Sequence, residues 1–120
     1  MKKIFLTLLV GGALLSCSNN EKPISQNSAE ETTALSPAEQ GKQLIQRSDC
    51  VSCHKTEGNL IGPSYQDIAQ KYTDKDIDKL ADKIIDGGVG NWGETAMTPH
   101  LGLSKEDAKL MVQYILTLKN

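Results

Sequence analysis

Two cysteines and a histidine stand in fixed register near the middle of this chain of 120 residues, as Cys50-Val51-Ser52-Cys53-His54. Two thiols at this spacing can reach the two vinyl groups of one porphyrin and form thioethers, and the histidine that follows then lies under the iron. The pattern is the attachment signature of a c-type haem. We therefore expect Cys50 and Cys53 to hold one covalent haem and His54 to supply the proximal imidazole nitrogen.

Zinc binding and dithiol chemistry are the competing interpretations of these cysteines. A structural zinc site needs four ligands, and Cys50, Cys53, His54 and His100 could only just supply them. A redox-active Cys-x-x-Cys pair is typical of a βαβ unit, whereas this sequence has no strand-rich stretch. Neither alternative explains the adjacent histidine as well as a haem does.

Composition narrows the class of protein further. The net charge of −2 excludes a generally basic nucleic-acid-binding protein, so we expect no nucleic-acid partner. Only 4 % of the residues are aromatic, and a domain of this size with so thin a core needs a staple such as a metal or a cofactor. A covalently held haem would supply a large apolar plate and two covalent bonds.

The N-terminal residues predict a processing signal followed by a tether. Lys2 and Lys3 precede a short apolar run over 4–15, which is too short to span a bilayer as a helix and reads as a signal peptide. The run ends in Leu14-Leu15-Ser16-Cys17, which resembles a bacterial lipobox. We expect residues 1–16 to be a lipoprotein signal peptide and Cys17 to carry the lipid, although an ordinary signal peptide with an incidental cysteine remains the alternative.

Residues 17–35 predict a flexible tether, because they are mostly Ser, Asn, Glu, Gln and Thr and bury too little apolar surface to become ordered. As a coil, such a segment has its ends on the order of 25 Å apart. The lipid would therefore hold the domain, residues 36–120, near the membrane of a bacterial cell envelope, facing the periplasm.

The pattern of the domain predicts an all-α fold of four helices wrapped around the haem. Ser36-Pro37-Ala38-Glu39 is a helix start, and this helix runs toward Asp49. Further helices are expected after Gly62-Pro63, from the cap at Thr73 to Gly87, and from Ser104 onward. The first and last helices should cross each other, and Gly41 either weakens the first or allows that close packing.

Lysines and aspartates alternate on the outer face of the third predicted helix. Such a face is normally solvated, and a dedicated docking patch is the more specific alternative. The residues are Lys71, Lys75, Lys79 and Lys83 beside Asp74, Asp78, Asp82 and Asp86.

A long loop over 88–102 separates the last two predicted helices, and a loop of that length in a compact domain is usually functional. It contains Met97, whereas Met1 belongs to the signal peptide and Met111 lies on an apolar helical stripe. A thioether opposite histidine is a standard pair of haem-iron ligands that raises the reduction potential. We expect Met97 to be the second axial ligand, with two alternatives: a loop methionine that only plugs the hydrophobic edge of the domain, or ligation by His100.

Four motifs in order give the domain a family resemblance over residues 36–119. The chain resembles a class I cytochrome c, in particular the short bacterial mono-haem type that donates electrons to terminal oxidases and reductases. The motifs are Cys50-Val51-Ser52-Cys53-His54, Ile61-Gly62-Pro63-Ser64-Tyr65, Gly90-Asn91-Trp92-Gly93 and Met97-Thr98-Pro99.

The resemblance implies roles for two further residues. Pro63 would accept a hydrogen bond from Nδ1–H of His54 through its backbone carbonyl, and Trp92 would pack at the haem edge and bind a propionate. An ordinary core tryptophan is the alternative for Trp92. The run Thr98-Pro99-His100 departs from many relatives, which have a second proline or another small residue there, so the polarity near Met97 is not predicted.

These expectations together predict a one-electron carrier and not an enzyme, because an iron with both axial positions filled by protein has no open site for a substrate. We expect a monomer whose partners are redox proteins such as a membrane reductase or terminal oxidase. The alternatives are a haem-based gas sensor or small peroxidase-like protein with a displaceable Met97 loop, and a zinc lipoprotein without haem.

Overall fold

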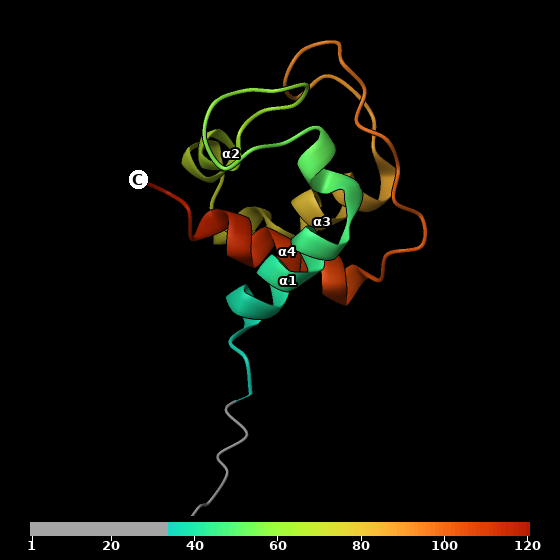
Figure 1. Cartoon of the computed structure of the whole chain (residues 1–120). Helices are drawn as coiled ribbons and strands as arrows, with labels where there is room; N and C mark the ends of the chain where they lie inside the picture. The colour runs from blue at the N-terminus through green and yellow to red at the C-terminus, as the bar shows by residue number, and fades with distance from the viewer. Residues whose placement is uncertain (1–33) are drawn as a thin grey trace, which may run out of the picture. The chain divides into compact units, whose positions relative to one another are not determined.

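The computed structural model describes residues 34–120, which form a small all-α domain (Figure 1). Its helices are α1 (Pro37–Arg47), α2 (Tyr65–Lys71), α3 (Ile77–Asp86) and α4 (Lys105–Leu116), with 3₁₀ turns η1 (Asp49–Ser52) and η2 (Asp74–Asp76). The prediction of four helices is confirmed. The predicted signal peptide, the lipidated Cys17 and most of the tether lie outside the described residues. Among the residues described, no helix has the length and apolarity needed to cross a membrane.

Side-chain caps explain where three of the helices begin. The hydroxyl of Ser36 accepts the N–H of Glu39 at 3.2 Å, that of Ser64 accepts the N–H of Asp67 at 3.0 Å, and Ser104 does the same for Asp107 at 3.1 Å. Each bond satisfies one of the N–H groups that has no partner within its helix.

The third helix begins later than its cap predicts. Thr73 and Asp76 form the expected reciprocal capping pair, but this pair closes a single 3₁₀ turn, in which Asp76 N–H bonds the carbonyl of Thr73 at 2.8 Å. Asp76 then has φ −96° and ψ 0°, outside regular helix geometry, so α3 starts at Ile77. Gly87 ends the helix with φ +66°, as predicted.

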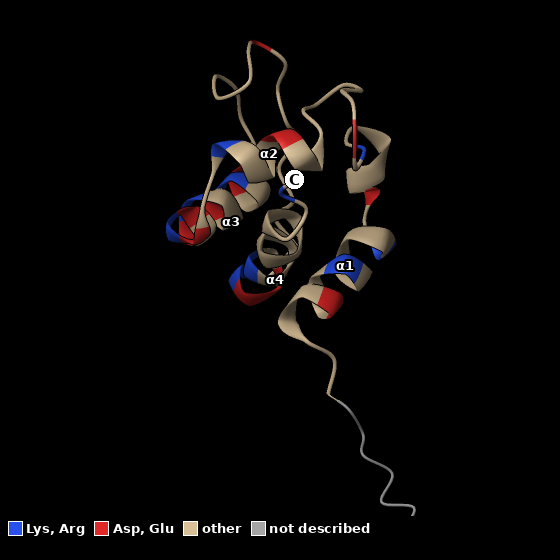
Figure 2. Cartoon of the chain, turned by 90° about the vertical axis from the view of Figure 1, so that its left-hand side faces the viewer, with Lys and Arg blue, Asp and Glu red and all other residues tan. Residues whose placement is uncertain are grey.

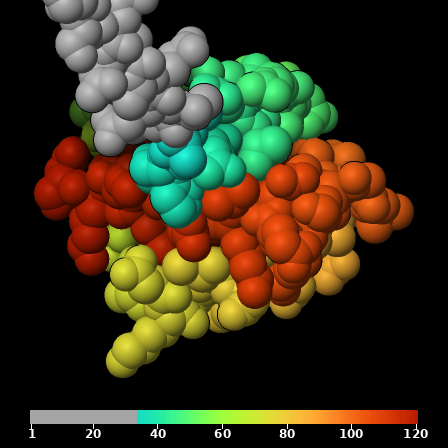
Figure 3. Space-filling model, turned by 90° about the horizontal axis from the view of Figure 1, so that it is seen from below, coloured from blue at the N-terminus to red at the C-terminus, as the bar shows by residue number. Residues whose placement is uncertain are grey.

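Helices α1 and α4 cross in close contact, as the sequence predicts (Figure 3, cyan against red). The contact is centred on Gly41, because a Cβ placed there would overlap the backbone carbonyl of Leu110 in α4. Gly41 therefore permits the close approach of two helix backbones, and this explains why a poor helix former is found in the middle of α1.

The core is formed by two clusters that share α4. Ala108 and Val112 pack with residues of α3, and Met111 and Ile115 pack with Ile45 of α1. Outside this core, Lys105 pairs with Asp82 and Lys109 pairs with Asp78, at 2.7 Å for the second pair, between α4 and α3. The predicted charged face is confirmed in part: Asp78, Lys79, Asp82 and Asp86 of α3 are exposed, but Lys71 ends α2, and Lys83 is only partly exposed and lines a cavity. Figure 2 shows the charged residues along α3 and α4. Hydrogen bonding and the charge of Lys109 lower the pKa of Asp78.

We expect Gly41→Ala to destabilise the protein by about 1–3 kcal/mol, because the added methyl group forces α1 and α4 apart. In an isolated helix the same change would be stabilising, so the sign of the effect is informative. Denaturant unfolding of the haem-loaded protein measures it. Gly102→Ala is the matched control, since a Cβ at Gly102 meets nothing within 4 Å. Equal unfolding midpoints for the two variants would contradict the proposed close approach.

Candidate functional site

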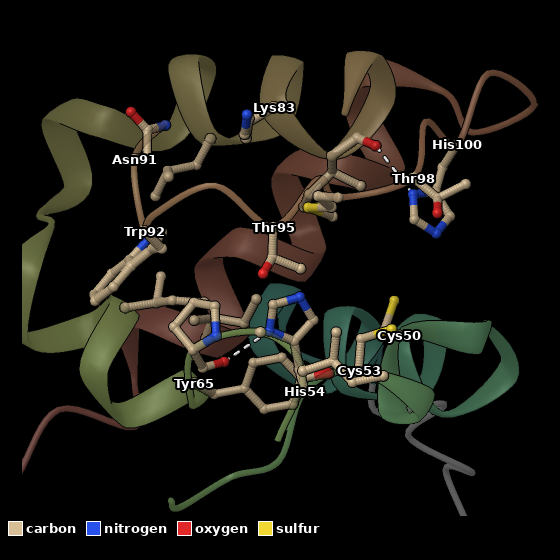
Figure 4. Close-up of a pocket in the computed structure, with 18 of the residues that line it drawn as sticks. Cys50, Cys53, His54, Tyr65, Lys83, Asn91, Trp92, Thr95, Thr98 and His100 are labelled. Atoms are coloured by element: carbon tan, nitrogen blue, oxygen red, sulfur yellow. Dashed lines mark hydrogen bonds between the residues drawn. The ribbon is translucent and has the colours of Figure 1, made fainter. Parts of the chain in front are cut away.

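A cavity of about 290 Å³ lies between the segment that follows α1 and the loop that follows α3. Figure 4 shows Cys50, Cys53, His54 and Tyr65 on one side of it and Lys83, Trp92, Thr95 and Thr98 on the other. Apolar side chains from all four helices form the rest of the wall: Ile45, Ile68, Leu80, Ile84, Met111, Val112 and Ile115. The cavity is therefore mostly apolar. The thiols of Cys50 and Cys53 and the imidazole of His54 are on one wall, and Lys83 and Trp92 are on the other.

Short-range backbone hydrogen bonds shape the cysteine segment. The carbonyl of Cys50 accepts the N–H groups of Cys53 at 3.1 Å and His54 at 2.9 Å, which winds the segment into one tight turn. The carbonyl of Cys53 accepts the N–H of Gly62 at 2.8 Å. Both thiols are half-buried and form no disulfide among the described residues. Burial and the neighbouring Asp49 carboxylate raise the pKa of the Cys50 thiol.

The imidazole of His54 is fixed from three sides. Its Nδ1 lies 2.7 Å from the carbonyl oxygen of Pro63, which can only accept, so Nδ1 carries a proton and Nε2 is the nitrogen that could bind an iron. Tyr65 stacks on the ring with centroids 5.7 Å apart. Gly62 lies against the edge of the ring that carries Cε1, because a Cβ at this position would be 2.5 Å from Cε1. The ring of His54 therefore lines the cavity in a fixed orientation, with Nδ1 engaged by Pro63.

Met97 belongs to the opposite wall. Its backbone forms an antiparallel bridge with Gly88, through hydrogen bonds of 2.9 and 3.0 Å. Thr95 and Thr98, its near neighbours in the chain, face His54 across the cavity in Figure 4. Met111 also lines the cavity, but its side chain is 1 % exposed and is packed among core residues of α1 and α4. Met97 is therefore the described methionine that lies on the loop wall opposite the histidine.

His100 is already engaged elsewhere. Its Nδ1 lies 3.1 Å from the carbonyl oxygen of Ile84, and its Nε2 lies 3.0 Å from a carboxylate oxygen of Asp49. In the part of the chain that the structure describes, no three His, Cys, Asp or Glu side chains are placed to hold a metal ion together. Neither the four-ligand zinc site nor ligation by His100 receives support from this arrangement.

Trp92 lies at the edge of the cavity and not in the core, since 42 % of it is exposed. The ammonium of Lys71 lies 4.2 Å from the centre of its ring and donates to the carbonyl of Asn91 at 2.8 Å. Lys83 also lines the cavity. The sequence predicts only a solvated row of lysines, and nothing in its spacing marks these two lysines as different from the others.

The site fits a covalently attached haem. An apolar cavity, two thiols one turn apart and a histidine on the same wall with its Nδ1 engaged by a backbone carbonyl are what a thioether-bound porphyrin needs. Tyr65 adds a buried hydroxyl without a hydrogen-bond partner in the described chain, and burial raises the pKa of this hydroxyl.

Comparison with known proteins agrees with this chemistry. Residues 38–119 match the cytochrome c family, and the chain belongs to that family, as a class I mono-haem member. Cytochrome c-552 of Nitrosomonas europaea is 42 % identical over 84 residues, which cover 68 % of this chain and 82 % of that protein. Cytochrome c-551 of Allochromatium vinosum is 42 % identical over 77 residues, covering 62 % and 82 %.

A solved structure extends the likeness to the fold. The crystal structure of wild-type Nitrosomonas europaea cytochrome c552 has a TM-score of 0.60 and 42 % identity, over 65 % of this chain and 99 % of that one. The chain therefore has the cytochrome c fold, binds one covalent haem c and is an electron carrier rather than an enzyme.

We expect Gly62→Ala to disturb the orientation of His54, because the new methyl group would meet Cε1 and Nδ1 of the ring. Rotation of the ring breaks the bond from Nδ1 to Pro63 and turns Nε2 away from its present direction. The absorption spectrum of the haem-loaded variant should show a loss of low-spin character, whereas Gly102→Ala should keep the native spectrum. An unchanged spectrum in Gly62→Ala would show that this glycine does not orient the histidine.

Proposed function

We propose that the protein carries single electrons in a periplasmic respiratory chain, through a haem iron held between His54 and Met97. The observation that carries the proposal is the placement of an oriented imidazole and a loop thioether on opposing walls of one cavity. When bound, the haem supplies an iron that exchanges one electron without a change of ligands. The chain supplies the ligands, their orientation and the apolar surroundings.

His54 supplies the nitrogen on the proximal side. The carbonyl of Pro63 accepts a hydrogen bond from Nδ1–H at 2.7 Å. This bond fixes the tautomer of the ring and raises the basicity of Nε2. Cys50 and Cys53 would hold the haem through two thioethers, since both thiols line the cavity and neither is engaged in a disulfide among the described residues. Two covalent bonds to the chain provide the staple that so small a core requires.

Met97 supplies the second axial atom. Its soft thioether favours the ferrous state and so raises the reduction potential. With both positions filled by protein, no open site remains for dioxygen or a substrate, which favours a carrier over a sensor or a peroxidase-like protein. Trp92, held at the cavity edge by Lys71, supplies an indole N–H that can donate to a haem propionate.

The cellular location of this carrier is inferred from the N-terminal sequence. A lipid on Cys17 and a polar segment over 17–35 would tether a monomeric domain to the membrane, facing the periplasm of a bacterial envelope. From there it would exchange electrons with redox partners such as a membrane reductase or terminal oxidase. Relatives named cytochrome c-551 and c-552 support the carrier role.

Met97→Ala tests the axial ligand and with it the function. The oxidised protein should show the weak near-infrared charge-transfer band of methionine-ligated ferric haem, and the variant should lose the band. The reduction potential should fall, because the soft sulfur no longer favours the ferrous state, and the iron should now bind carbon monoxide.

Met111→Leu is the matched control, because Met111 is buried and a swap of similar volume is tolerated. It should keep the band, and His100→Ala should keep it as well. Survival of the band in Met97→Ala would refute the assignment. Ready binding of carbon monoxide by the unaltered protein would favour the sensor instead of the carrier.

Cys17→Ser tests the anchor. We expect the variant to be released as a soluble, folded, red protein, because a lipid chain that is absent can no longer bind the bilayer. Fractionation of the cell envelope and mass spectrometry of the N-terminus provide the measurement. An unmodified Cys17 in the mature protein, or cleavage at another position, would end the lipoprotein proposal without touching the role of the haem.

A further inference from the structure

His100 connects three separate parts of the chain around the cavity. Its backbone N–H donates to the carbonyl of Ile85 at 2.9 Å, and its ring Nδ1 lies 3.1 Å from the carbonyl oxygen of Ile84. Both carbonyls lie in the last turn of α3, where a helix leaves such groups without partners. On its other side, Nε2 lies 3.0 Å from Asp49, the residue before the first cysteine of the attachment motif.

The chemistry of the two partners determines the protonation state of this arrangement. A backbone carbonyl and a carboxylate both accept hydrogen bonds and donate none. A neutral imidazole has a single N–H and can satisfy one of them, whereas an imidazolium has two and satisfies both. The geometry with both contacts is therefore that of the imidazolium, and the C-terminal end of α3 favours the same charge.

The position of His100 gives this contact an effect on the cavity. Met97 lies three residues before His100, and its backbone is bonded to Gly88 at the start of the same loop. The contacts of His100 hold the C-terminal part of that loop against α3, through Ile84, and against the turn that carries the cysteines, through Asp49. In Figure 4 the His100 ring lies beside Thr98 and above Cys50.

We propose that His100 is a positioning residue that fastens the Met97 loop to the haem-attachment turn through Asp49, and that the fastening is complete only when the imidazole is doubly protonated. This inference rests on the proposed ligation by Met97. As the pH rises and the ring becomes neutral, it can donate to only one of the two acceptors. The bond to Ile84 is the one retained in this proposal, because water can hydrate the largely exposed carboxylate of Asp49 in place of the ring. The loop end is then less restrained, and external ligands displace the thioether more readily.

Other charged groups near His100 are few among the described residues. Asp49 and Cys50 line a small hollow together with His100, and the Cys50 sulfur would be an uncharged thioether in the haem-loaded protein. Lys83 and Asp86 flank the two α3 carbonyls in the chain. The side chain of Lys83 is directed toward Gly88. Of these groups, only Asp49 forms an ion pair with the ring; the side chains are 21 % exposed for His100 and 74 % for Asp49.

Cyanide binding to the ferric, haem-loaded protein measures how easily the loop releases its ligand. Each variant is compared with the unaltered protein at the same pH, at about pH 5.5 and about pH 8, on either side of the usual histidine pKa. His100→Ala should bind cyanide about two- to fivefold faster at the lower pH, since it loses an ion pair whose carboxylate is largely exposed. The difference in the rate of cyanide binding between His100→Ala and the unaltered protein should shrink at the higher pH, because there the unaltered protein has also lost its bond to Asp49.

Asp49→Asn gives the sharper result. An asparagine amide can donate to the neutral Nε2 while Nδ1–H still bonds Ile84, so this variant keeps the contact at high pH. It should bind cyanide faster than the unaltered protein at about pH 5.5 and more slowly at about pH 8. Glu94→Gln, an exposed acid in the same loop, is the matched control and should change neither rate.

Two outcomes overturn the proposal. One is the same pH dependence in Asp49→Asn as in the unaltered protein, and the other is no acceleration at the lower pH in His100→Ala. Should His100→Ala fail to fold, the Asp49→Asn crossover decides alone. Protection of the His100 amide hydrogen, taken as its exchange rate relative to the intrinsic rate at the same pH, reports the contact without the axial ligand. This protection should be greater at low pH in the unaltered protein and depend less on pH in Asp49→Asn. Failure of the Met97 assignment would be seen separately, in a near-infrared band that survives Met97→Ala.

Discussion

The buried face of α4 is the constraint on which the rest of the structure depends. Ala108 and Val112, one helical turn apart, belong to the cluster formed with α3, and Met111 and Ile115 belong to the cluster formed with α1. One helix therefore serves two cores from adjacent rows of side chains. Because Gly41 lets α1 approach the backbone of α4, the cysteine turn that follows α1 is placed opposite the loop that follows α3. The cavity is a consequence of that placement.

Local signals predicted the helices well, because caps and apolar periodicity act over a few residues. Ser36, Ser64 and Ser104 cap helices as their positions suggest. The start of α3 was wrong by one turn, since the Thr73–Asp76 pair is equally compatible with a 3₁₀ turn and sequence does not distinguish the two. The covalent haem was predicted from a spacing that chemistry alone explains.

The residues that the sequence could not assign are those whose partners lie far along the chain. Lys71 looks like its neighbours in a charged row until the fold brings Asn91 and Trp92 to it. His100 shows no local pattern at all, because its partners Ile84 and Asp49 lie 16 and 51 residues away. Roles of this kind follow from tertiary placement, and a single sequence carries no signal for them.

The two walls of the cavity are held in different ways, and the difference bears on electron transfer. Bonds among residues 50–65 fix the histidine wall, and these bonds join residues close together in the chain around His54. The methionine wall is a loop tied at separate points, by Gly88 to Met97, by Lys71 at Asn91 and by His100.

Ties that divide a loop into short segments lower the entropy that its closed form must overcome. If Met97 ligates the iron as proposed, a thioether on such a loop can stay bound in both oxidation states, so that electron exchange requires little rearrangement. In that proposal the position of His54 depends on local sequence, whereas retention of Met97 depends on a few long-range contacts. Changes at those contacts would tune the distal ligand without altering the haem attachment.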